Sequence, residues 1–317
     1  MSPELPVGFQ WRRPGPEDAE AIFAVIDRHN RPLVGSPDVT LREVRDELTA
    51  PGFATSSDAW LVGDDAGVDA AYGWASRNGA SDMVDVDVYA DDAVAGWLWT
   101  RVLSRARELG AAAGHDVITV DIAIYQNDGA QQARARARGF APVTTFQRMR
   151  IDFDGPPTDP VVPVGVVVRT GPGDDAFRRH AHDVSTRAFA QHFGFVERSF
   201  EEWHQAIDAT ITSDWAQLRV AYIDGQPVAM VRSSDQFVDD EDCGYVTTVA
   251  VLSAERGRGL AKLLLLQAFA ADFNRGRRGT VLHVDANNVT PAVGLYQHVG
   301  MRAVLAIDVW RARYPTT

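Results

Sequence analysis

The segment from Val249 to Lys262 constrains the fold of this chain more strongly than any other. It is an apolar run that ends in a glycine-rich turn and passes directly into a second apolar stretch with helical spacing. The small residues Gly257, Gly259 and Ala261 let an anion approach the free N–H groups at the start of a helix. The pattern therefore predicts a strand, a phosphate-binding turn and a helix over residues 260–274.

Two common phosphate-binding motifs do not fit this turn. No Gly-Lys-Ser or Gly-Lys-Thr triplet follows it, which excludes a Walker A loop. The dinucleotide fingerprint requires a third glycine after Gly257 and Gly259, and that glycine is absent. The order Arg-x-x-Gly-x-Ala over residues 256–261 instead resembles the acetyl-CoA pyrophosphate loop of the GNAT superfamily of N-acetyltransferases.

A second segment adds to this resemblance. A predicted strand at 281–284 is followed by Asn288, by Tyr296 on a short helix, and by a turn at Gly300 and Met301. In GNAT enzymes a strand, an Asn, a helix with Leu-Tyr and a Gly-Phe or Gly-Met turn follow the phosphate loop in this order. The spacing after Asn288 is one residue longer here than in the commonest version.

Composition limits the classes of protein to be considered. The chain has 317 residues and a net charge of −12, which fits an acidic protein and argues against a nucleic-acid partner. Cys243 is the single cysteine, so no disulfide forms within the chain. The first residues lack a basic and apolar leader pattern, and no apolar stretch is long enough for a membrane span. We expect a cytoplasmic protein with no membrane partner.

The same order of elements is predicted twice along the chain. Each copy has a hairpin, a strand, a long helix, another strand, a glycine-containing turn and a final strand. The paired segments are 59–76 and 218–231, 83–89 and 245–251, 93–109 and 260–274, 117–124 and 281–284, and 147–153 and 304–311. A proline-rich stretch at 154–164 lies between the copies and is typical of an extended linker.

This repeat resembles tandem GNAT proteins of the mycothiol synthase type, in which the C-terminal domain is the active one. The resemblance implies an α/β fold of two tandem GNAT-like domains, each with a central, mostly antiparallel mixed sheet flanked by helices. We expect a degenerate domain at 1–153, a linker at 154–164 and a catalytic domain at 165–317.

The two copies are not equally equipped for binding CoA. Where the second has its glycine-rich turn, the first has Asp91, Asp92 and the bulky Trp97, and the carboxylates repel a pyrophosphate. Alignment of the two glycine turns places Ala135 opposite Tyr296, so the first copy also lacks the phenol. We expect one CoA site per chain.

The resemblance implies roles for residues of the second copy. It assigns the backbone N–H of Val249 to the acetyl oxygen, Val251 to the pantetheine arm and Tyr296 to the general acid. The expected acetyl-CoA-binding residues are Val249, Val251, Arg256, Gly257, Arg258, Gly259, Ala261, Lys262 and Asn288.

The general base is less clearly marked. Acidic residues precede the strand at 245–251, and Glu241 is the first candidate, with Asp285 next. In the mycothiol synthase pattern a Glu stands where Tyr245 aligns, and this departure bears on both the base and the substrate. His283, two residues before Asp285 on the same strand face, is either a proton relay or a structural residue.

The expected reaction is transfer of an acetyl group from acetyl-CoA to a primary amine of a small molecule. The alternatives are a GNAT-fold enzyme that uses another acyl-CoA or catalyses a different acyl-transfer reaction, and a non-catalytic sensor that binds acyl-CoA. The aromatic segment 189–203 resembles the part of tandem GNATs that covers the acceptor cleft, and it also fits a core. His180 and His182 do not share a helical face, so no metal site is expected. The sequence identifies neither the acceptor nor the oligomeric state.

Overall fold

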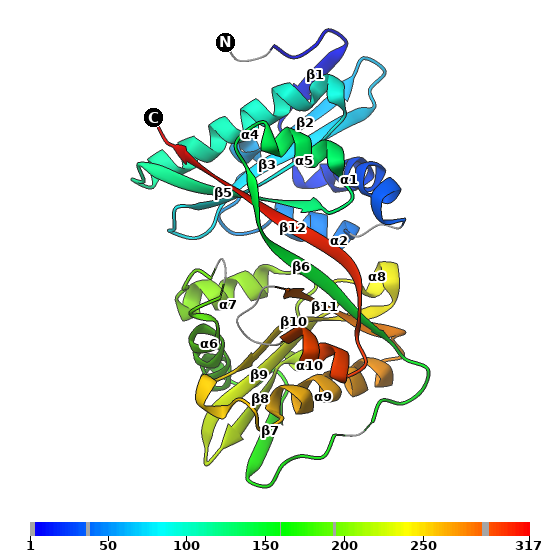
Figure 1. Cartoon of the computed structure of the whole chain (residues 1–317), viewed down its shortest axis with the longest axis vertical. Coiled ribbons are helices and arrows are strands. Elements are labelled where there is room, and N and C mark those ends of the chain that lie inside the picture. Colours follow the sequence, from blue (N-terminus) through cyan, green and yellow to red (C-terminus); the bar gives the residue numbers. More distant parts are fainter. Residues whose placement is uncertain (1–3, 36–38, 159, 193–194, 287–291) are drawn as a thin grey trace. The chain divides into compact units, whose positions relative to one another are not determined.

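The computed structural model describes residues 4–35, 39–158, 160–192, 195–286 and 292–317 (Figure 1). The chain divides into two compact units. Unit 1 comprises Met1–Thr145 together with Ile307–Thr317, and unit 2 comprises Phe146–Ala306. Within the described ranges, no helix combines the length and the apolar character needed to cross a membrane.

Unit 1 is built on a sheet with the strand order β1-β2-β3-β4-β5-β12. Its pairs are antiparallel except for β4 and β5, which are parallel. The strands are β1 (Phe9–Arg12), β2 (Ala59–Asp64), β3 (Asp69–Arg77), β4 (Met83–Ala90), β5 (Val117–Tyr125) and β12 (Arg302–Pro315).

Helices cover both faces of this sheet. Apolar side chains of α1 and α2 pack on one face around Leu61 and Tyr72, and those of α4 and α5 pack on the other around Val86 and Ile122. The helices are α1 (Ala19–Val34), α2 (Leu41–Leu48), α3 (Thr55–Asp58), α4 (Asp92–Ala112) and α5 (Gly129–Arg136), with a 3₁₀ turn η1 at Pro16–Asp18.

Unit 2 repeats this arrangement with the strand order β6-β11-β10-β9-β8-β7. Here β10 and β11 are the parallel pair, and the other pairs are antiparallel. The strands are β6 (Ala141–Asp152), β7 (Val166–Thr170), β8 (Arg219–Ile223), β9 (Gln226–Ser234), β10 (Cys243–Val251) and β11 (Gly279–Asp285).

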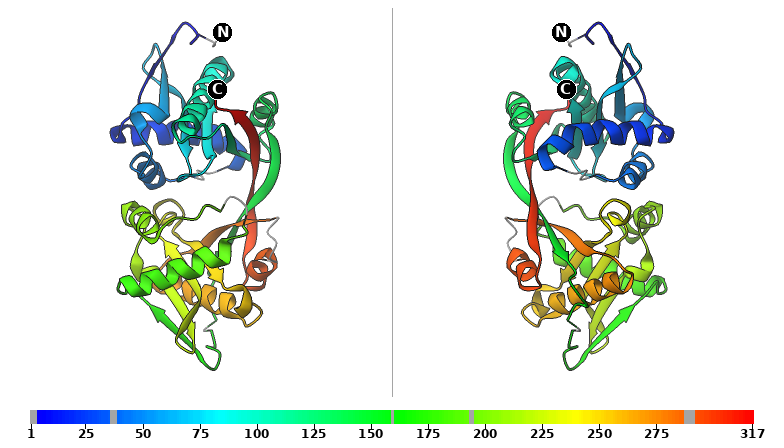
Figure 2. Two further views of the ribbon diagram at one scale, coloured as in Figure 1. Left: turned by 90° about the vertical axis from the view of Figure 1, so that its left-hand side faces the viewer. Right: turned by 90° about the vertical axis from the view of Figure 1, so that its right-hand side faces the viewer.

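The helices of unit 2 also lie on both faces of its sheet (Figure 2). Phe177 and Val184 of α6 pack on one face against Met230, whereas Leu264 of α9 and Val299 next to α10 pack on the other. The helices are α6 (Asp175–Phe189), α7 (Phe200–Ala209), α8 (Val238–Glu241), α9 (Leu260–Asn274) and α10 (Ala292–His298), with 3₁₀ turns η2 (Trp215–Gln217) and η3 (Ser253–Glu255).

The last strand of each sequence repeat completes the sheet of the other unit. Strand β6 begins in unit 1, but its residues from Phe146 onward pair with β11. Strand β12 begins in unit 2, and its residues from Ile307 onward pair with β5. The observed units therefore differ from the expected ranges 1–153 and 165–317 by these exchanged strands. The proline-rich segment at 154–164 lies within the residues of unit 2.

Ion pairs attach both exchanged strands. In unit 1 the guanidinium of Arg311 on β12 donates two hydrogen bonds of 2.7 Å to the carboxylate of Asp121 on β5. In unit 2 the arginines Arg148 and Arg150 on β6 both bind the carboxylate of Glu241 at the end of α8. Bidentate and charge-assisted contacts of this kind are stronger than neutral hydrogen bonds.

The predicted elements are confirmed, including the hairpins and a helix that spans 260–274 as expected. The exchange of final strands was not predicted, because the strand pattern of 147–153 and 304–311 specifies a face and not a partner. Residues of both segments alternate between the two faces of a sheet in the same way, so the pattern of either segment is compatible with either sheet.

Gly279 tests how closely β6 must approach β11. A Cβ atom at this position would lie 2.2 Å from the carbonyl oxygen of Ile151 on β6. We expect Gly279→Ala to destabilise unit 2 by about 2 kcal/mol or more, because backbone atoms must move. Gly294→Ala in α10 is the matched control, since a Cβ there meets nothing within 4 Å and Ala favours a helix.

Thermal unfolding of both variants checks this prediction. Gly279→Ala should lower Tm by several degrees, and Gly294→Ala should leave Tm unchanged or raise it slightly. An unchanged Tm for Gly279→Ala would show that the pairing of β6 with β11 is looser than the structure indicates.

Candidate active site

Strands β10 and β11 separate part-way along their length, and this opening positions the site. Their parallel ladder ends at the pair Val246 and Leu282, although β11 continues to Asp285 and β10 to Val251. The register of β10 against β9 shifts between Val246 and Thr248, which is a β-bulge. A bulge bends its strand and interrupts the ladder. The second part of β10 is therefore paired with β9 and diverges from β11.

The hydrogen-bond pattern shows which peptide groups of β10 face this gap. Leu252 donates its N–H to the carbonyl of Val228 at 3.0 Å, so this residue points toward β9. In an antiparallel ladder such residues alternate with residues whose N–H and C=O groups point away. Val249 and Val251 are therefore the residues that direct their peptide groups into the gap. The carbonyl of Val251 accepts a 3.4 Å bond from Nε of Arg256 on that side.

The turn after β10 presents backbone amides to the same region. Gly257 and Gly259 both have φ of +78°, a conformation that side chains disfavour, and a Cβ on either would meet nothing within 4 Å. Gly259 is the N-cap of α9, and its carbonyl accepts the first helical bond from Leu263 at 2.9 Å. The first three amides of α9 have no partner within the helix and carry its positive dipole end. The space beside both glycines is therefore open.

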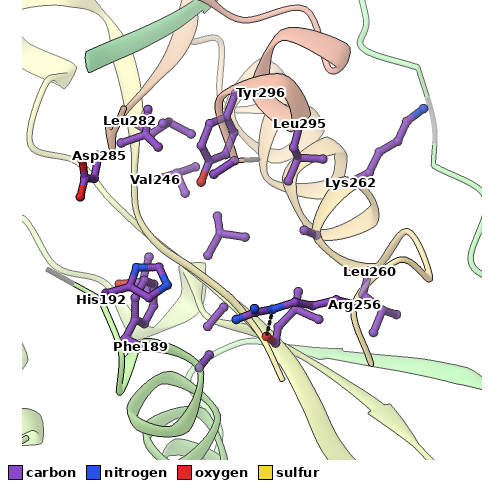
Figure 3. Close-up of a pocket in the computed structure, with 18 of the residues that line it drawn as sticks. Phe189, His192, Val246, Arg256, Leu260, Lys262, Leu282, Asp285, Leu295 and Tyr296 are labelled. Carbon is purple, nitrogen blue, oxygen red and sulfur yellow. Dashed lines mark hydrogen bonds between the residues drawn. The ribbon is translucent and has the colours of Figure 1, made fainter. Parts of the chain in front are cut away.

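A pocket of about 540 Å³ joins the gap to this turn, a volume within the range of small-molecule sites. The pocket is lined by β10, β11, the turn, α9 and α10, and by the end of α6 with the segment after it (Figure 3). The expected residues that line it are Val249, Val251, Arg256, Gly257, Gly259, Ala261, Lys262, Asp285 and Tyr296. Most of the anticipated CoA-binding residues thus surround one cavity.

Two expected CoA-binding residues are not part of this lining. Arg258 is exposed at the turn and forms a 2.5 Å ion pair with Glu255. Asn288 lies outside the residues that the structure describes.

Tyr296 is held on α10 with its hydroxyl directed into the pocket (Figure 3). Its ring packs in the apolar core on the α9 face, and the side chain is 8% exposed. Burial raises the pKa of the phenol to about 12. The group therefore stays protonated at neutral pH and can donate a hydrogen bond into the pocket.

The structure does not bring Glu241 to the pocket. Its carboxylate is held between Arg148 and Arg150 on β6, and Glu241 is absent from the described lining residues. Both oxygens of this carboxylate are thus engaged by arginines of β6 and are not free to contact a substrate in the pocket. The expectation that Glu241 is the general base therefore has no support from the geometry, which assigns this residue to the attachment of β6.

Asp285 and two imidazoles are the titratable groups of β11 and the α6 side that line the pocket. Burial lowers the pKa of His283 to about 4, with Arg148 adding to the effect, and its Nδ1 lies 3.0 Å from the hydroxyl of Tyr245. His283 is thus neutral at pH 7. Burial and the nearby Arg256 also lower the pKa of His192, while Asp285 opposes this shift.

Sequence reasoning did not identify His192 or Phe146 as pocket residues. His192 follows α6, its ring lies 4.6 Å from that of Phe189, and both enter the pocket from the side opposite Tyr296 (Figure 3). The aromatic segment 189–203 was the signal for His192. Phe146 belongs to the exchanged strand β6, so the repeat pattern gave no indication that it lines this site.

The other histidines and the tyrosine considered in the sequence analysis contact neighbouring protein groups. Nδ1 of His180 lies 3.1 Å from the hydroxyl of Tyr222, and Nε2 of His182 lies 2.9 Å from the carbonyl oxygen of Arg198. Tyr245, which stands where the mycothiol synthase pattern has a Glu, packs edge-on against Phe237. A phenol at this position is not an equivalent of a carboxylate base.

Comparison with known proteins agrees with this geometry. Residues 181–301 match the model of the Acetyltransferase (GNAT) family. This segment is therefore similar to GNAT acetyltransferase domains. GNAT acetyltransferases use acetyl-CoA as co-substrate. The match covers the bulged strand, the glycine turn and α10, which together form the pocket.

Curated relatives and solved structures extend the likeness beyond the GNAT domain. A mycothiol acetyltransferase from Cellulomonas flavigena is 31% identical over 199 residues, which cover 57% of this chain and 53% of that protein. One from Nocardia farcinica is 29% identical over 212 residues, covering 64% of this chain and 66% of that protein. The match with the Cellulomonas protein thus spans about half of its length.

Among solved structures, a GCN5-related N-acetyltransferase from Sphaerobacter thermophilus superposes with a TM-score of 0.80 and 27% identity, covering 98% of this chain and 97% of that one. A tandem GNAT protein from the clavulanic acid biosynthesis pathway has a TM-score of 0.71 and 17% identity, covering 96% and 98% of the two chains. The second likeness concerns the fold alone. Both structures cover nearly the whole chain, so the likeness in fold includes unit 1 as well as unit 2.

Glu241 and Asp285 provide a matched pair of tests. Glu241→Gln should destabilise the protein by about 3 kcal/mol, because two arginines lose their shared counter-charge, while turnover per folded molecule is retained. Asp285→Asn should lower turnover and change Tm little, because its carboxylate lines the pocket. Thermal unfolding and acetyl-CoA consumption measure the two effects. A loss of turnover in Glu241→Gln at unchanged Tm would restore Glu241 as the base.

Proposed function

We propose that this protein transfers an acetyl group from acetyl-CoA to a primary amine of a small molecule, at a single site in unit 2. One observation carries the proposal. The separation of β10 from β11 leaves peptide groups of Val249 and Val251 facing a gap whose end meets the free amides of α9. This arrangement suits a ligand with a polar, extended arm and an anionic end.

The residues at the turn fit the pyrophosphate of CoA. The N-terminal amides of α9 are hydrogen-bond donors, and the open space at Gly257 and Gly259 admits phosphate oxygens. Arg256 and Lys262 line the pocket and add positive charge in a chain whose net charge is −12. The pantetheine arm then lies along Val251, with the thioester near Val249 and Tyr296.

Chemistry at this position requires one bond to form and one to break. The amine nitrogen attacks the carbonyl carbon of the thioester, and the N–H of Val249 stabilises the oxygen anion of the tetrahedral intermediate. The C–S bond breaks, and the phenol of Tyr296 donates a proton to the departing sulfur. The amine loses one proton, for which we propose Asp285 as acceptor, directly or through water.

We propose that unit 1 is a degenerate GNAT-like domain that does not bind CoA. Strand β4 ends at Ala90 and α4 begins at Asp92, so a single residue stands where unit 2 has a glycine turn. That residue, Asp91, is the N-cap, and its charge opposes a phosphate. Ala135, expected opposite Tyr296, is buried in the core.

Substitution of Gly259 tests the cofactor site. Isothermal calorimetry should find one acetyl-CoA per chain, and Gly259→Asp should weaken binding by about 2 kcal/mol or more, roughly 30-fold in Kd. Gly259→Ala is the matched control, since it imposes the same backbone strain at φ +78° without the charge. Binding of two equivalents, or equal affinities for Gly259→Asp and the parent, would contradict the proposed site.

Tyr296→Phe tests the proton donor. The ring packing is retained, so Tm and acetyl-CoA affinity should change little, whereas kcat should fall by roughly 10²-fold. Tyr222→Phe, which removes another hydroxyl of unit 2 outside the pocket lining, is the control and should leave kcat unchanged. A screen of amines, aminoglycosides, amino sugars and peptide N-termini identifies the acceptor for these measurements. If kcat is unchanged while chemistry limits the rate, Tyr296 is not the donor.

A further inference from the structure

Arg232 stands on β9 directly beside the bulge of β10. It pairs with Thr248, the first residue after the bulge, and Thr248 lines the pocket. Side chains two residues apart on a strand share a face, so Arg232 lies on the same face as Met230, which packs against α6. This is the face from which Phe189 and His192 enter the pocket. Arg232 is therefore on the side opposite Tyr296 and next to a pocket-lining residue, although Arg232 and Ser234 are not themselves among the described lining residues.

The guanidinium of Arg232 has little compensation within the protein. Its Nε is buried without a hydrogen-bond partner, and its one hydrogen bond in the described part of the chain is a 3.5 Å contact from Nη1 to Oγ of Ser213. No carboxylate pairs with it in the same residues. Burial lowers its pKa to about 10, so the group is still charged at pH 7. Oγ of Ser234, two residues further along the strand, is also buried without a partner.

Three other arginines of low exposure in unit 2 are paired with carboxylates, whereas the buried Arg219 is bonded to the backbone carbonyl of Gln217. Arg148 and Arg150 share Glu241, and Arg277 binds Asp235 at 2.5 Å. Arg232, like Arg219, has no ion pair with a carboxylate among the described residues, and it differs from Arg219 in lying beside the pocket-lining Thr248. A buried charge without a partner costs stability, and such groups are typical of sites that a ligand completes.

We propose that Arg232, with the hydroxyl of Ser234, binds a carboxylate of the acceptor, so that the substrate carries both an amine and a carboxylate. This inference rests on the proposed acetyl transfer, and it deepens it by naming the class of acceptor. The planar guanidinium matches a carboxylate by two parallel N–H···O bonds. Asp285 on the pocket wall then attracts the cationic amine, and the two charges orient an amino-acid-like molecule.

Arg232→Met tests the subsite, because it removes the charge and keeps an apolar stem of similar length. We expect this variant to have an equal or higher Tm without ligand, since an uncompensated buried charge is lost. The control is Arg187→Met, which removes an exposed arginine paired with Asp183 on α6. Arg232→Lys is the second variant, and it keeps a charge without the bidentate geometry.

Two measurements are made on the full chain with each variant. The first is the shift of Tm by glycine, β-alanine, succinate, phosphate and sulfate. The second is kcat/KM for β-alanine and 4-aminobutyrate against ethylamine and propylamine, which lack the carboxylate. The parent and Arg187→Met should be stabilised by the carboxylates, and should prefer the carboxylate-bearing amines by about tenfold or more. Arg232→Met should lose the stabilisation and the preference, and Arg232→Lys should retain a fraction of each.

Three results overturn the inference. One is a Tm of Arg232→Met well below that of the parent with the carboxylate preference intact, which assigns Arg232 to structure. Another is the absence of any shift by the carboxylates in the parent. The third is a shift by phosphate or sulfate alone, which indicates a phosphorylated or sulfated acceptor. An Arg232-dependent shift by carboxylates with no acetyl transfer to any amine instead overturns the proposed function and leaves the subsite standing.

Discussion

The divergence of β10 from β11 beyond Val246 is the constraint on which the site depends. Neighbouring strands normally use their peptide groups for each other, and the bulge at Thr247 ends this pairing for half of β10. The peptide groups of Val249 and Val251 are then available to a ligand. Since the opening passes through the sheet, the pocket is bounded by Tyr296 on the α9 face and by Phe189 on the α6 face.

Positive charge is unevenly distributed around the pocket. The start of α9 offers backbone donors with Arg256 and Lys262, although the chain as a whole is strongly acidic. Positive charge is therefore concentrated at this point of an acidic chain, on side chains that are exposed to solvent. Elsewhere Arg148 is neutralised by Glu241, and Arg277 is paired with Asp235. Whether an arginine has a carboxylate partner therefore indicates its role better than its degree of exposure does.

The parts of the site that lie close together in the sequence could be predicted from it. The glycine turn, α9 and Tyr296 are encoded in about fifty consecutive residues, and local spacing is sufficient to place them. The role of Glu241 could not be predicted, because its partners Arg148 and Arg150 are about ninety residues away. The position of Phe146 and the exchange of β6 and β12 likewise depend on long-range strand pairing. The alternation of residues along a strand does not specify which strand it pairs with.

The exchange of final strands has a consequence for biosynthesis. Unit 1 lacks its β12 strand until the last residues of the chain have been translated, and the bond from Arg311 to Asp121 joins positions 190 residues apart. On the ribosome, the first half therefore emerges with one edge of β5 unpaired, and such edges are prone to association with other chains. Contacts of long sequence separation also form slowly. Neither sequence repeat completes its own sheet without a strand from the other, so the two halves must fold together.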